Sequence, residues 1–149
     1  MAETQQRRID PESLSRMNAE KAAPLQDIFV HCMKGKVALV SGGASGLGYM
    51  VVNRLCEAGA KVVIASRGEA RAKRALEDLR SKGYEVTWVQ TDVSKVDACY
   101  AAVDCAVNTY GSLDVLVTCA AGWSSYSYLD LPETVYDRIM DTDLKGSYF

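Results

Sequence analysis

Between residues 36 and 52 the chain reads Lys36-Val37-Ala38-Leu39-Val40, Ser41-Gly42-Gly43-Ala44-Ser45-Gly46-Leu47-Gly48 and Tyr49-Met50-Val51-Val52. This order predicts a buried strand, a glycine-rich turn and the start of a helix. A diphosphate reaches the backbone N–H groups of a helix start only where side chains are absent, and Gly42, Gly46 and Gly48 meet that need. The stretch therefore predicts a turn that binds the pyrophosphate of a dinucleotide.

Two other nucleotide-binding turns fit this stretch less well. A P-loop ends in Gly-Lys-Ser/Thr, whereas Gly48 is followed by Tyr49, so the lysine for the terminal phosphates is missing. A methyltransferase turn needs an acidic residue after the next strand to hold a ribose, and here Ser66 and Arg67 stand at that point. The dinucleotide interpretation is preferred.

Composition limits the other classes of function. The 149 residues are 48% hydrophobic and 24% charged, with a net charge of -2, which predicts one soluble globular core and no nucleic-acid partner. No signal peptide and no stretch of about 20 apolar residues is found, which predicts a cytoplasmic protein without a membrane partner. Five cysteines without a Cys-x-x-Cys pair and one histidine predict reduced thiols and no metal site.

The remaining pattern divides the chain in two. Residues 1–35 predict an N-terminal extension, with a short helix from Asp10-Pro11 to Ala22, and residues 36–149 predict an NAD(P)-binding domain that is incomplete at its C-terminus. In the second part strands alternate with helices. The expected strands are Val37–Val40, Val62–Ala65, Glu85–Gln90 and Val115–Thr118, and the expected helices are Leu47–Ala58, Glu69–Lys82, Lys95–Tyr110 and a segment from Pro132 onward. This alternation predicts an α/β Rossmann fold, a three-layer α/β/α structure with a doubly wound parallel sheet of order 3-2-1-4.

Each expected helix has one apolar stripe that should pack on the sheet. The stripes are Ala72, Leu76 and Leu79; Val96, Tyr100, Val103, Val107 and Tyr110; and Val135, Ile139, Thr142, Gly146 and Phe149. Asp143 falls on the margin of the last stripe, where a carboxylate near a buried face predicts a structural or functional role.

In the expected strand order, the glycine turn and the segment after Thr118 face one crevice. Arg67 follows the second strand, where a carboxylate would hold the ribose hydroxyls of NAD and repel a 2′-phosphate, so Ser66 and Arg67 favour NADP(H) over NAD(H). A second interpretation is also open, because Ser66-x-x-Glu69 is a capping box that would leave Arg67 solvated in the first turn, and the two interpretations are compatible for Ser66.

Two further segments reach the crevice. Asp92 and Val93 end the third strand, where the carboxylate can accept a hydrogen bond from adenine or simply form a turn, and Ser94-x-x-Asp97 predicts a cap for the next helix. The small residues after the fourth strand let the chain pass close to a cofactor, or simply form a tight turn. Trp123 to Tyr128 offer aromatic surface for an apolar substrate or for an interface.

Together these residues resemble the short-chain dehydrogenase/reductase family over Lys36 to Phe149. The family motif Thr-Gly-x-x-x-Gly-x-Gly matches from Ser41 to Gly48, Asp-Val matches Asp92-Val93, and the fourth-strand motif matches Leu113 to Val117. Two departures resemble the dienoyl-CoA reductase branch. The family's Asn-Asn-Ala-Gly becomes Thr118-Cys119-Ala120-Ala121-Gly122, and Asp143 stands where the family has an asparagine that helps to hold a proton-relay water.

The resemblance implies hydride transfer between NADP(H), or NAD(H), and a ketone or secondary alcohol of an apolar, for example steroid-like, substrate, by a dimer or tetramer built through the last helix. It implies cofactor binding by Ser41, Gly42, Ser45, Gly46, Leu47, Gly48, Ser66, Arg67, Asp92, Val93, Cys119, Ala120, Ala121 and Gly122, with Asp143 as a catalytic residue. The alternatives are an acyl-CoA double-bond reductase and a non-catalytic nucleotide-binding module. The family's Tyr-x-x-x-Lys pair is absent, so we expect the catalytic serine, tyrosine and lysine beyond Phe149.

Overall fold

The computed structural model describes residues 32–149 of the chain. The helix expected from Asp10 to Ala22 lies outside the described residues, as does most of the expected extension. Its last residues form a turn against the domain, where the Met33 N–H donates a hydrogen bond of 2.9 Å to the carbonyl of Ala58 and the Met33 side chain packs on the core.

The centre of the domain is a parallel sheet whose order confirms the prediction. Its strands are β1 (Val37–Ser41), β2 (Lys61–Ser66), β3 (Val86–Gln90) and β4 (Val115–Thr118), and they lie in the order β3-β2-β1-β4. In the centre, Val40 pairs with Ile64 of β2 on one side and with Val117 of β4 on the other. Because all strands are parallel, their carboxyl ends meet at one edge of the sheet.

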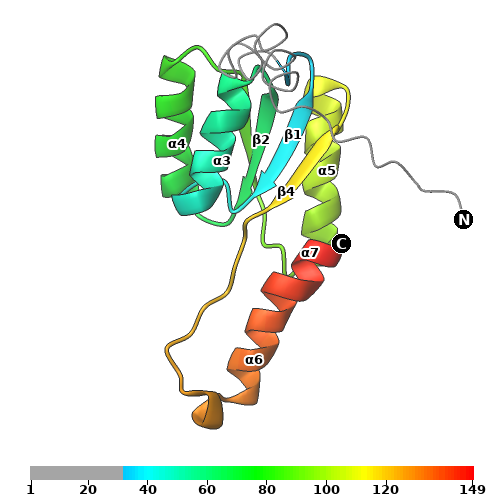
Figure 1. Ribbon diagram of the computed structural model, residues 1–149. Helices are drawn as coiled ribbons and strands as arrows, with labels where there is room; N and C mark the ends of the chain where they lie inside the picture. Colours follow the sequence, from blue (N-terminus) through cyan, green and yellow to red (C-terminus); the bar gives the residue numbers. More distant parts are fainter. Residues whose placement is uncertain (1–31) are drawn as a thin grey trace, which may run out of the picture.

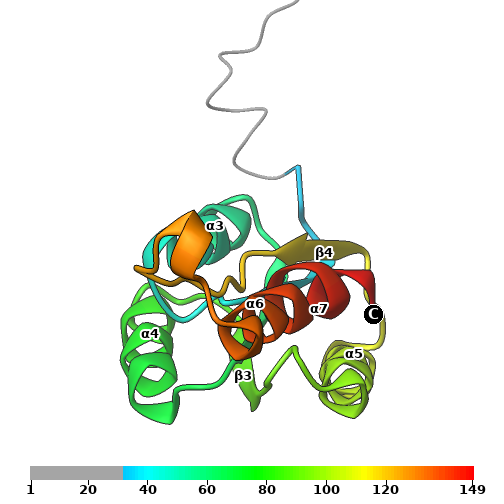
Figure 2. The ribbon, with the colours of Figure 1, turned by 90° about the horizontal axis from the view of Figure 1, so that it is seen from below.

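Helices cover both faces of this sheet and make it doubly wound. The helices α3 (Gly46–Glu57) and α4 (Glu69–Ser81) lie on one face, and α5 (Val96–Tyr110) lies on the other (Figure 1 and Figure 2). A short 3-10 turn (Tyr128–Asp130), α6 (Glu133–Met140), a π-helical turn (Asp141–Lys145) and α7 (Gly146–Tyr148) follow β4 and extend past the carboxyl ends of the strands (Figure 1).

The core has two halves, separated by the sheet. On the side of α3 and α4, Val40, Ile64 and Leu79 are almost completely buried, and on the side of α5 the strands pack against Ala102 and Ala106. Burying a side chain the size of valine or leucine contributes about 1.5–3 kcal/mol, so these short, continuously apolar strands carry much of the stability.

The stripe expected on the third helix is wrong in part. The side chains of α5 that are buried against the sheet are Cys99, Ala102 and Ala106, whereas Tyr100 is 56% exposed and Val107 is 43% exposed. The buried residues have the same helical spacing as the expected stripe, but they lie on a neighbouring face of α5 that carries smaller side chains. Small side chains let α5 approach the sheet closely, and a search for the largest apolar side chains overlooks them.

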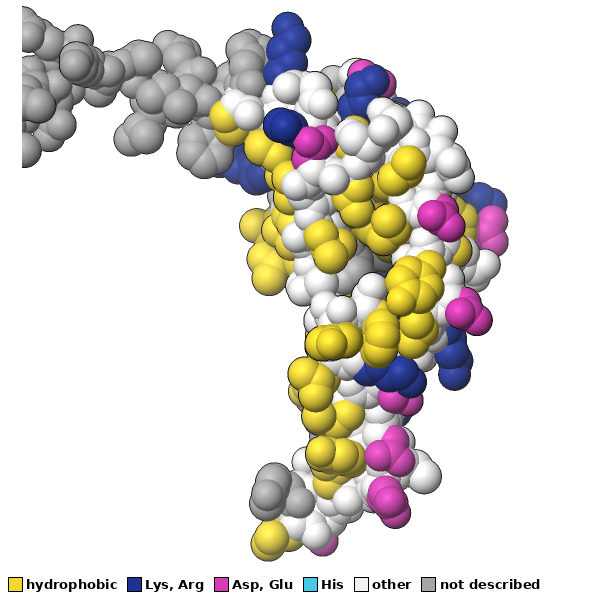
Figure 3. Space-filling view, turned by 90° about the vertical axis from the view of Figure 1, so that its right-hand side faces the viewer, with side chains coloured by type: hydrophobic (Ala, Val, Ile, Leu, Met, Phe, Trp, Pro, Cys, Tyr) yellow, Lys and Arg dark blue, Asp and Glu magenta, His cyan; other side chains and the backbone are white. Residues whose placement is uncertain are grey.

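The β4 edge and the α6–α7 segment carry exposed apolar side chains. Leu116 on β4 and Tyr136, Leu144 and Tyr148 on the segment below it are all more than half exposed. Figure 3 shows hydrophobic side chains gathered along this side of the molecule. No helix within residues 32–149 is both long and apolar enough to cross a membrane.

A carboxylate joins the starts of β1 and β4. Asp114 accepts hydrogen bonds from the backbone N–H of Val37 and the ammonium of Lys36, both at 2.9 Å, and from the Ser112 hydroxyl at 3.2 Å. The Val37 N–H, followed by the Lys36 ammonium, lowers the pKa of Asp114 below its usual value. The ionised form is therefore the one that the fold favours.

We expect Asp114→Ala to lower the midpoint of thermal unfolding at pH 7 by on the order of a few degrees. Because the pKa of Asp114 is lowered in the folded state, its stabilisation is complete above the unfolded pKa of about 4 and is lost as the pH falls through the folded pKa. Thermal unfolding followed by circular dichroism from pH 7 to pH 3 should show the two proteins converging in acid. Asp130→Ala, which removes an exposed carboxylate outside the sheet, is the control, and an equal pH dependence in both variants would contradict this account.

Candidate functional site

A cavity of about 390 Å³ opens at the carboxyl ends of the strands, and we call it the strand-end cavity. The segments after the four strands, the first turns of α3 and α4, and Thr142 of the π-helical turn form its walls. The lining residues are Gly42, Ala44, Ser45, Leu47, Gly48, Ala65, Ser66, Arg67, Gly68, Arg71, Thr91, Asp92, Val93, Cys119, Ala120, Ala121 and Thr142. The structure therefore brings most of the predicted site residues together, and Ser41, Gly46, Gly122 and Asp143 are the predicted residues outside this lining.

The three glycines of the turn after β1 meet different surroundings. A Cβ atom on Gly48 would lie 2.4 Å from the carbonyl oxygen of Gly42, and one on Gly42 would lie 2.7 Å from the carbonyl oxygen of Cys119. These two glycines are required by the packing of the chain itself. Gly46 has a φ of +56°, which favours glycine, and nothing lies within 4 Å of its Cβ position, so the clearance for a ligand at this turn stays a prediction.

The start of α3 leaves its backbone donors available. Ser45 is the N-cap residue, but its side chain makes no capping hydrogen bond. The first N–H groups of a helix have no partner within the helix and carry the positive end of its dipole. An anion that enters the strand-end cavity beside Ser45, Gly46 and Leu47 therefore meets unpaired donors.

Ser41 supports the site from below. It is buried at the end of β1, and its hydroxyl oxygen lies 3.2 Å from the N–H of Cys119 and 3.3 Å from the N–H of Ala120, from which it accepts hydrogen bonds. We therefore interpret Ser41 as a residue that positions the turn after β4, and not as a direct contact for a ligand.

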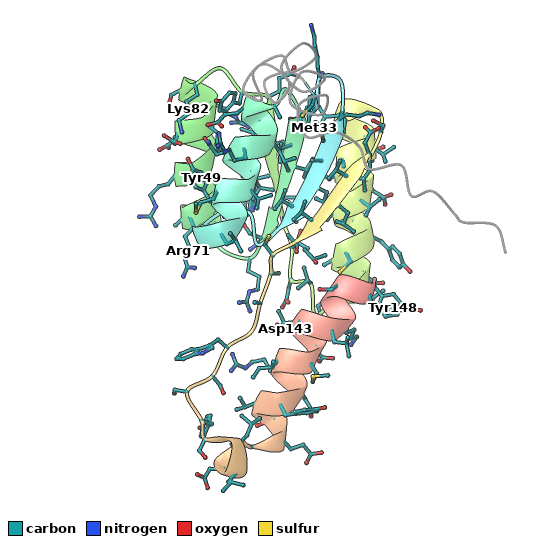
Figure 4. All side chains as sticks on the ribbon, in the orientation of Figure 1. Met33, Tyr49, Arg71, Lys82, Asp143 and Tyr148 are labelled. Atoms are coloured by element: carbon teal, nitrogen blue, oxygen red, sulfur yellow. The ribbon has the colours of Figure 1, made fainter. Side chains whose placement is uncertain are left out.

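Two arginines reach the cavity where β2 leads into α4. Arg67 was predicted from its place after the strand, and Arg71 stands one helical turn further on, in the first turns of α4. Sequence reasoning missed Arg71, because Arg67 lies before the N-cap Gly68 and no helical spacing within α4 links the two side chains. Figure 4 shows Arg71 at the end of α4 nearest to the glycine turn.

The alternative role of Ser66 as a helix cap is wrong. The N-cap of α4 is Gly68 and makes no side-chain capping bond, because the helix begins later than a capping box from Ser66 requires. The Ser66 hydroxyl instead accepts a hydrogen bond of 3.0 Å from the indole N–H of Trp88 on β3.

Asp92 closes the turn after β3. Its Oδ1 accepts hydrogen bonds from the Ser94 hydroxyl at 2.8 Å and from the Ser94 N–H at 3.1 Å, so Ser94 serves this turn and does not cap α5, whose N-cap is Lys95. Burial raises the pKa of Asp92, but the Ser94 hydrogen bonds and the charges of Arg67 and Lys95 outweigh burial and lower it. An ionised carboxylate therefore lines the cavity opposite the glycine turn.

The last side of the site is built by glycine contacts and one carboxylate. A Cβ atom on Gly146 would lie 2.7 Å from the carbonyl oxygen of Val93, and one on Gly122 would lie 3.2 Å from the Cα of Ile139. Asp143 Oδ1 accepts a hydrogen bond of 2.5 Å from the Gly122 N–H. Asp143 is exposed and holds the turn after β4 from outside the cavity lining, so its contact is that of a positioning residue.

The π-helical turn brings one more residue to the cavity. Thr142 is buried, lines the cavity and donates a hydrogen bond of 2.9 Å from its hydroxyl to the carbonyl of Arg138. The sequence placed Thr142 on an apolar stripe and gave no sign of this position, because a π turn inserts a residue and changes the helical register. Trp123 and Tyr126 are exposed outside the cavity, and their contact with a substrate remains a prediction.

Comparison with known proteins identifies the family. The profile described as short chain dehydrogenase matches residues 36–149. The chain belongs to this family. An uncharacterized oxidoreductase of Thermotoga maritima is 38% identical over 116 residues, which cover 78% of this chain and 45% of the relative. Dehydrogenase/reductase SDR family member 4 of Bos taurus is 34% identical and covers 77% of this chain and 42% of the relative.

Solved structures of short-chain dehydrogenases share the fold. A variant of actinorhodin polyketide ketoreductase solved with NADPH is 33% identical, with a TM-score of 0.73 over 76% of this chain and 43% of that chain. The chain therefore spans less than half the length of these relatives. The family uses NAD or NADP, and the uncapped start of α3, the open space at Gly46 and the arginines of the cavity fit the phosphates of such a cofactor.

We expect Gly48→Ala to destabilise the domain by about 1–3 kcal/mol, because the new methyl group overlaps the carbonyl of Gly42 and the turn must move. The matched control is Gly68→Ala, since Gly68 has a φ of -94° and nothing lies within 4 Å of its Cβ position. This control should cost less than about 1 kcal/mol. Urea unfolding measures both values, and an equal loss in the two variants would show that the close backbone contact is unimportant.

Proposed function

We propose that the strand-end cavity binds NADP(H) and that the protein moves hydride between the nicotinamide and a ketone or secondary alcohol of an apolar substrate. The observation that carries the proposal is the combination of an uncapped helix start with two arginines in one cavity. When bound, the cofactor supplies the hydride donor or acceptor. The residues of this chain bind and orient it.

The pyrophosphate is proposed to lie against the start of α3. Side chains from Ser45 to Leu47 are exposed there, and Gly46 leaves the backbone bare. The N–H groups of this helix start and its dipole stabilise a negative charge, and Gly48 keeps the helix close to the turn. Any side chain at residue 46 would stand in the way of this approach.

Arg67 and Arg71 are proposed to hold the 2′-phosphate that distinguishes NADP from NAD. Within the described residues no salt bridge involves either guanidinium, so both are available to a ligand. A guanidinium can bind phosphate with two parallel hydrogen bonds, and the residue directly after β2 is Arg67, where a carboxylate would repel the phosphate. NAD(H) remains the alternative cofactor.

The other end of the cavity is proposed to receive the adenine and the nicotinamide. Asp92 has its Oδ2 without a protein hydrogen bond in residues 32–149, so this oxygen can accept one from the adenine amino group. Val93 lies beside it. The small residues Cys119, Ala120 and Ala121 are proposed to pass under the nicotinamide, with Asp143 fixing the following Gly122.

This chain supplies the cofactor-binding part of the reaction. Its 149 residues contain no tyrosine followed four positions later by lysine, the pair in which the tyrosine donates the proton and the lysine lowers the pKa of that tyrosine in this family. The activity and substrates of the whole protein are therefore proposals, and a steroid-like or other lipophilic ketone suits the exposed aromatic loop around Trp123 and Tyr126.

A second candidate is the reduction of an activated carbon-carbon double bond of an acyl-CoA. The observation that favours it is the hydrogen bond between Gly122 and Asp143, because it joins the two positions at which the sequence departs toward the dienoyl-CoA reductase branch. Turnover assays with a ketone and with a dienoyl-CoA separate the candidates, and nucleotide binding without either turnover would favour a non-catalytic module.

We propose a dimer or tetramer through the segment from α6 to α7, where a second copy would cover the exposed side chains of Tyr136, Leu144 and Tyr148. We propose the cytoplasm as the compartment, since Cys56, Cys99, Cys105 and Cys119 form no disulfide. Sedimentation equilibrium tests the oligomer.

For cofactor choice, we expect Arg67→Gln and Arg71→Gln each to raise the Kd for NADPH roughly tenfold while changing the Kd for NADH by less than about twofold. The physical reason is that only NADPH carries the 2′-phosphate. Fluorescence titration of both coenzymes measures the ratio. Lys73→Gln, which removes a neighbouring charge that is paired with Glu69, is the control, and an unchanged ratio in the arginine variants would refute the assignment.

A further inference from the structure

A second hollow lies beside the strand-end cavity, between α3 and α4, and we call it the α3–α4 groove. It has a volume of about 320 Å³. Its lining residues are Ala44, Ser45, Tyr49, Arg71, Arg74, Ala75 and Asp78. Both hollows are lined by Ala44, Ser45 and Arg71. Arg74 lines only the groove, and Arg67 lines only the cavity. The groove is therefore adjacent to the proposed cofactor site but has a cation of its own.

The basic residues of α4 differ in their partners. Lys73 forms a salt bridge of 2.7 Å with Glu69, and Lys82 forms one of 2.7 Å with Asp78. Within the described residues, neither Arg71 nor Arg74 has a salt bridge or a side-chain hydrogen bond. The helix thus neutralises its lysines with its own acids and leaves the arginines of the groove available.

The acid in the groove does not cancel these charges. Asp78 accepts hydrogen bonds from the Lys82 ammonium and from the Tyr49 hydroxyl, and the Lys82 ammonium in turn donates one to Asn53. The Lys82 ammonium, followed by the Tyr49 hydroxyl, lowers the pKa of Asp78, which is therefore ionised and paired at neutral pH. Figure 4 shows Tyr49 between the two helices and Lys82 at the end of α4 opposite to Arg71.

What remains in the groove is two guanidinium groups and a free hydroxyl. The Ser45 hydroxyl makes no capping bond, so it can donate to a ligand in the groove. Guanidinium groups match the oxygens of phosphate, and a dianionic phosphate balances two of them. The arrangement combines charge, donors and a hollow of sufficient size.

We propose that the α3–α4 groove is a second anion site, which takes a dianionic phosphate, free or as a monoester, separate from the bound dinucleotide. Arg74 and Arg71 are its charged contacts and Ser45 its hydroxyl donor. This assignment does not depend on hydride transfer. Because Arg71 also lines the strand-end cavity, phosphate in the groove should weaken NADPH more than NADH, and the coupling is reciprocal.

Phosphorus NMR of inorganic phosphate, added to the full chain without cofactor and at constant ionic strength, tests the site directly. We expect saturable broadening of the phosphate signal, with binding roughly fivefold weaker in Arg74→Gln. Lys73→Gln removes one positive charge from the position directly before Arg74 in α4 and should change the affinity for phosphate by less than about twofold. Absence of saturable binding, or an equal effect of both variants, would overturn the proposal in favour of a diffuse basic surface.

NADPH and NADH titrations of Arg74→Gln distinguish the two sources of phosphate. If the groove is a separate site, this variant weakens inorganic phosphate and leaves the ratio of NADPH to NADH affinity unchanged. A selective loss of NADPH affinity would overturn the separate site and assign Arg74 to the 2′-phosphate of the cofactor. Phosphate binding by a chain that takes up neither coenzyme would refute the proposed function and still support the groove.

Discussion

The close approach of bare backbone at the turn between β1 and α3 is the constraint on which the site depends. Gly48 packs on the carbonyl of Gly42, and Gly42 packs on the carbonyl of Cys119, at distances that no Cβ atom tolerates. The Ser41 hydroxyl adds hydrogen bonds to the same segment after β4. Two turns that are far apart in the sequence are therefore held as one unit, and α3 begins where its free N–H groups face the strand-end cavity.

A second pair of glycine contacts fixes the opposite wall. Gly146 lies against Val93 after β3, and Gly122 lies against Ile139 of α6. The Asp143 carboxylate adds a charge-assisted hydrogen bond to Gly122. In this way the turn after β3, the turn after β4 and the segment from α6 to α7 depend on one another. The cavity is shaped by backbone contacts, and Arg67, Arg71 and Asp92 place charged side chains in its lining.

Much of this arrangement can be predicted from sequence, because strand order and the switch point follow from alternating apolar runs and right-handed crossovers. Contacts between segments that are distant in the sequence cannot be predicted in the same way. Ala102 and Ala106 of α5 are buried against the sheet, whereas the larger Tyr100 and Val107 are exposed, because close packing of a helix on a sheet favours small residues. Thr142 lines the cavity because it lies in a π-helical turn, and the sequence pattern of the helix does not indicate where such a turn occurs. Ser66 does not cap α4, because its hydroxyl accepts a hydrogen bond from Trp88 and the helix begins only at Glu69.

The most direct test of the account is a proton-nitrogen NMR titration of the labelled chain with NADPH. The account predicts that the largest amide shifts fall on the four turns of the strand-end cavity, around residues 42–48, 66–71, 91–93 and 119–122, and that the outer end of α5 near Tyr110 is unaffected. Shifts that cluster elsewhere, or a spectrum that NADPH and NADH leave unchanged, would contradict the claim that bare backbone at this turn receives a dinucleotide.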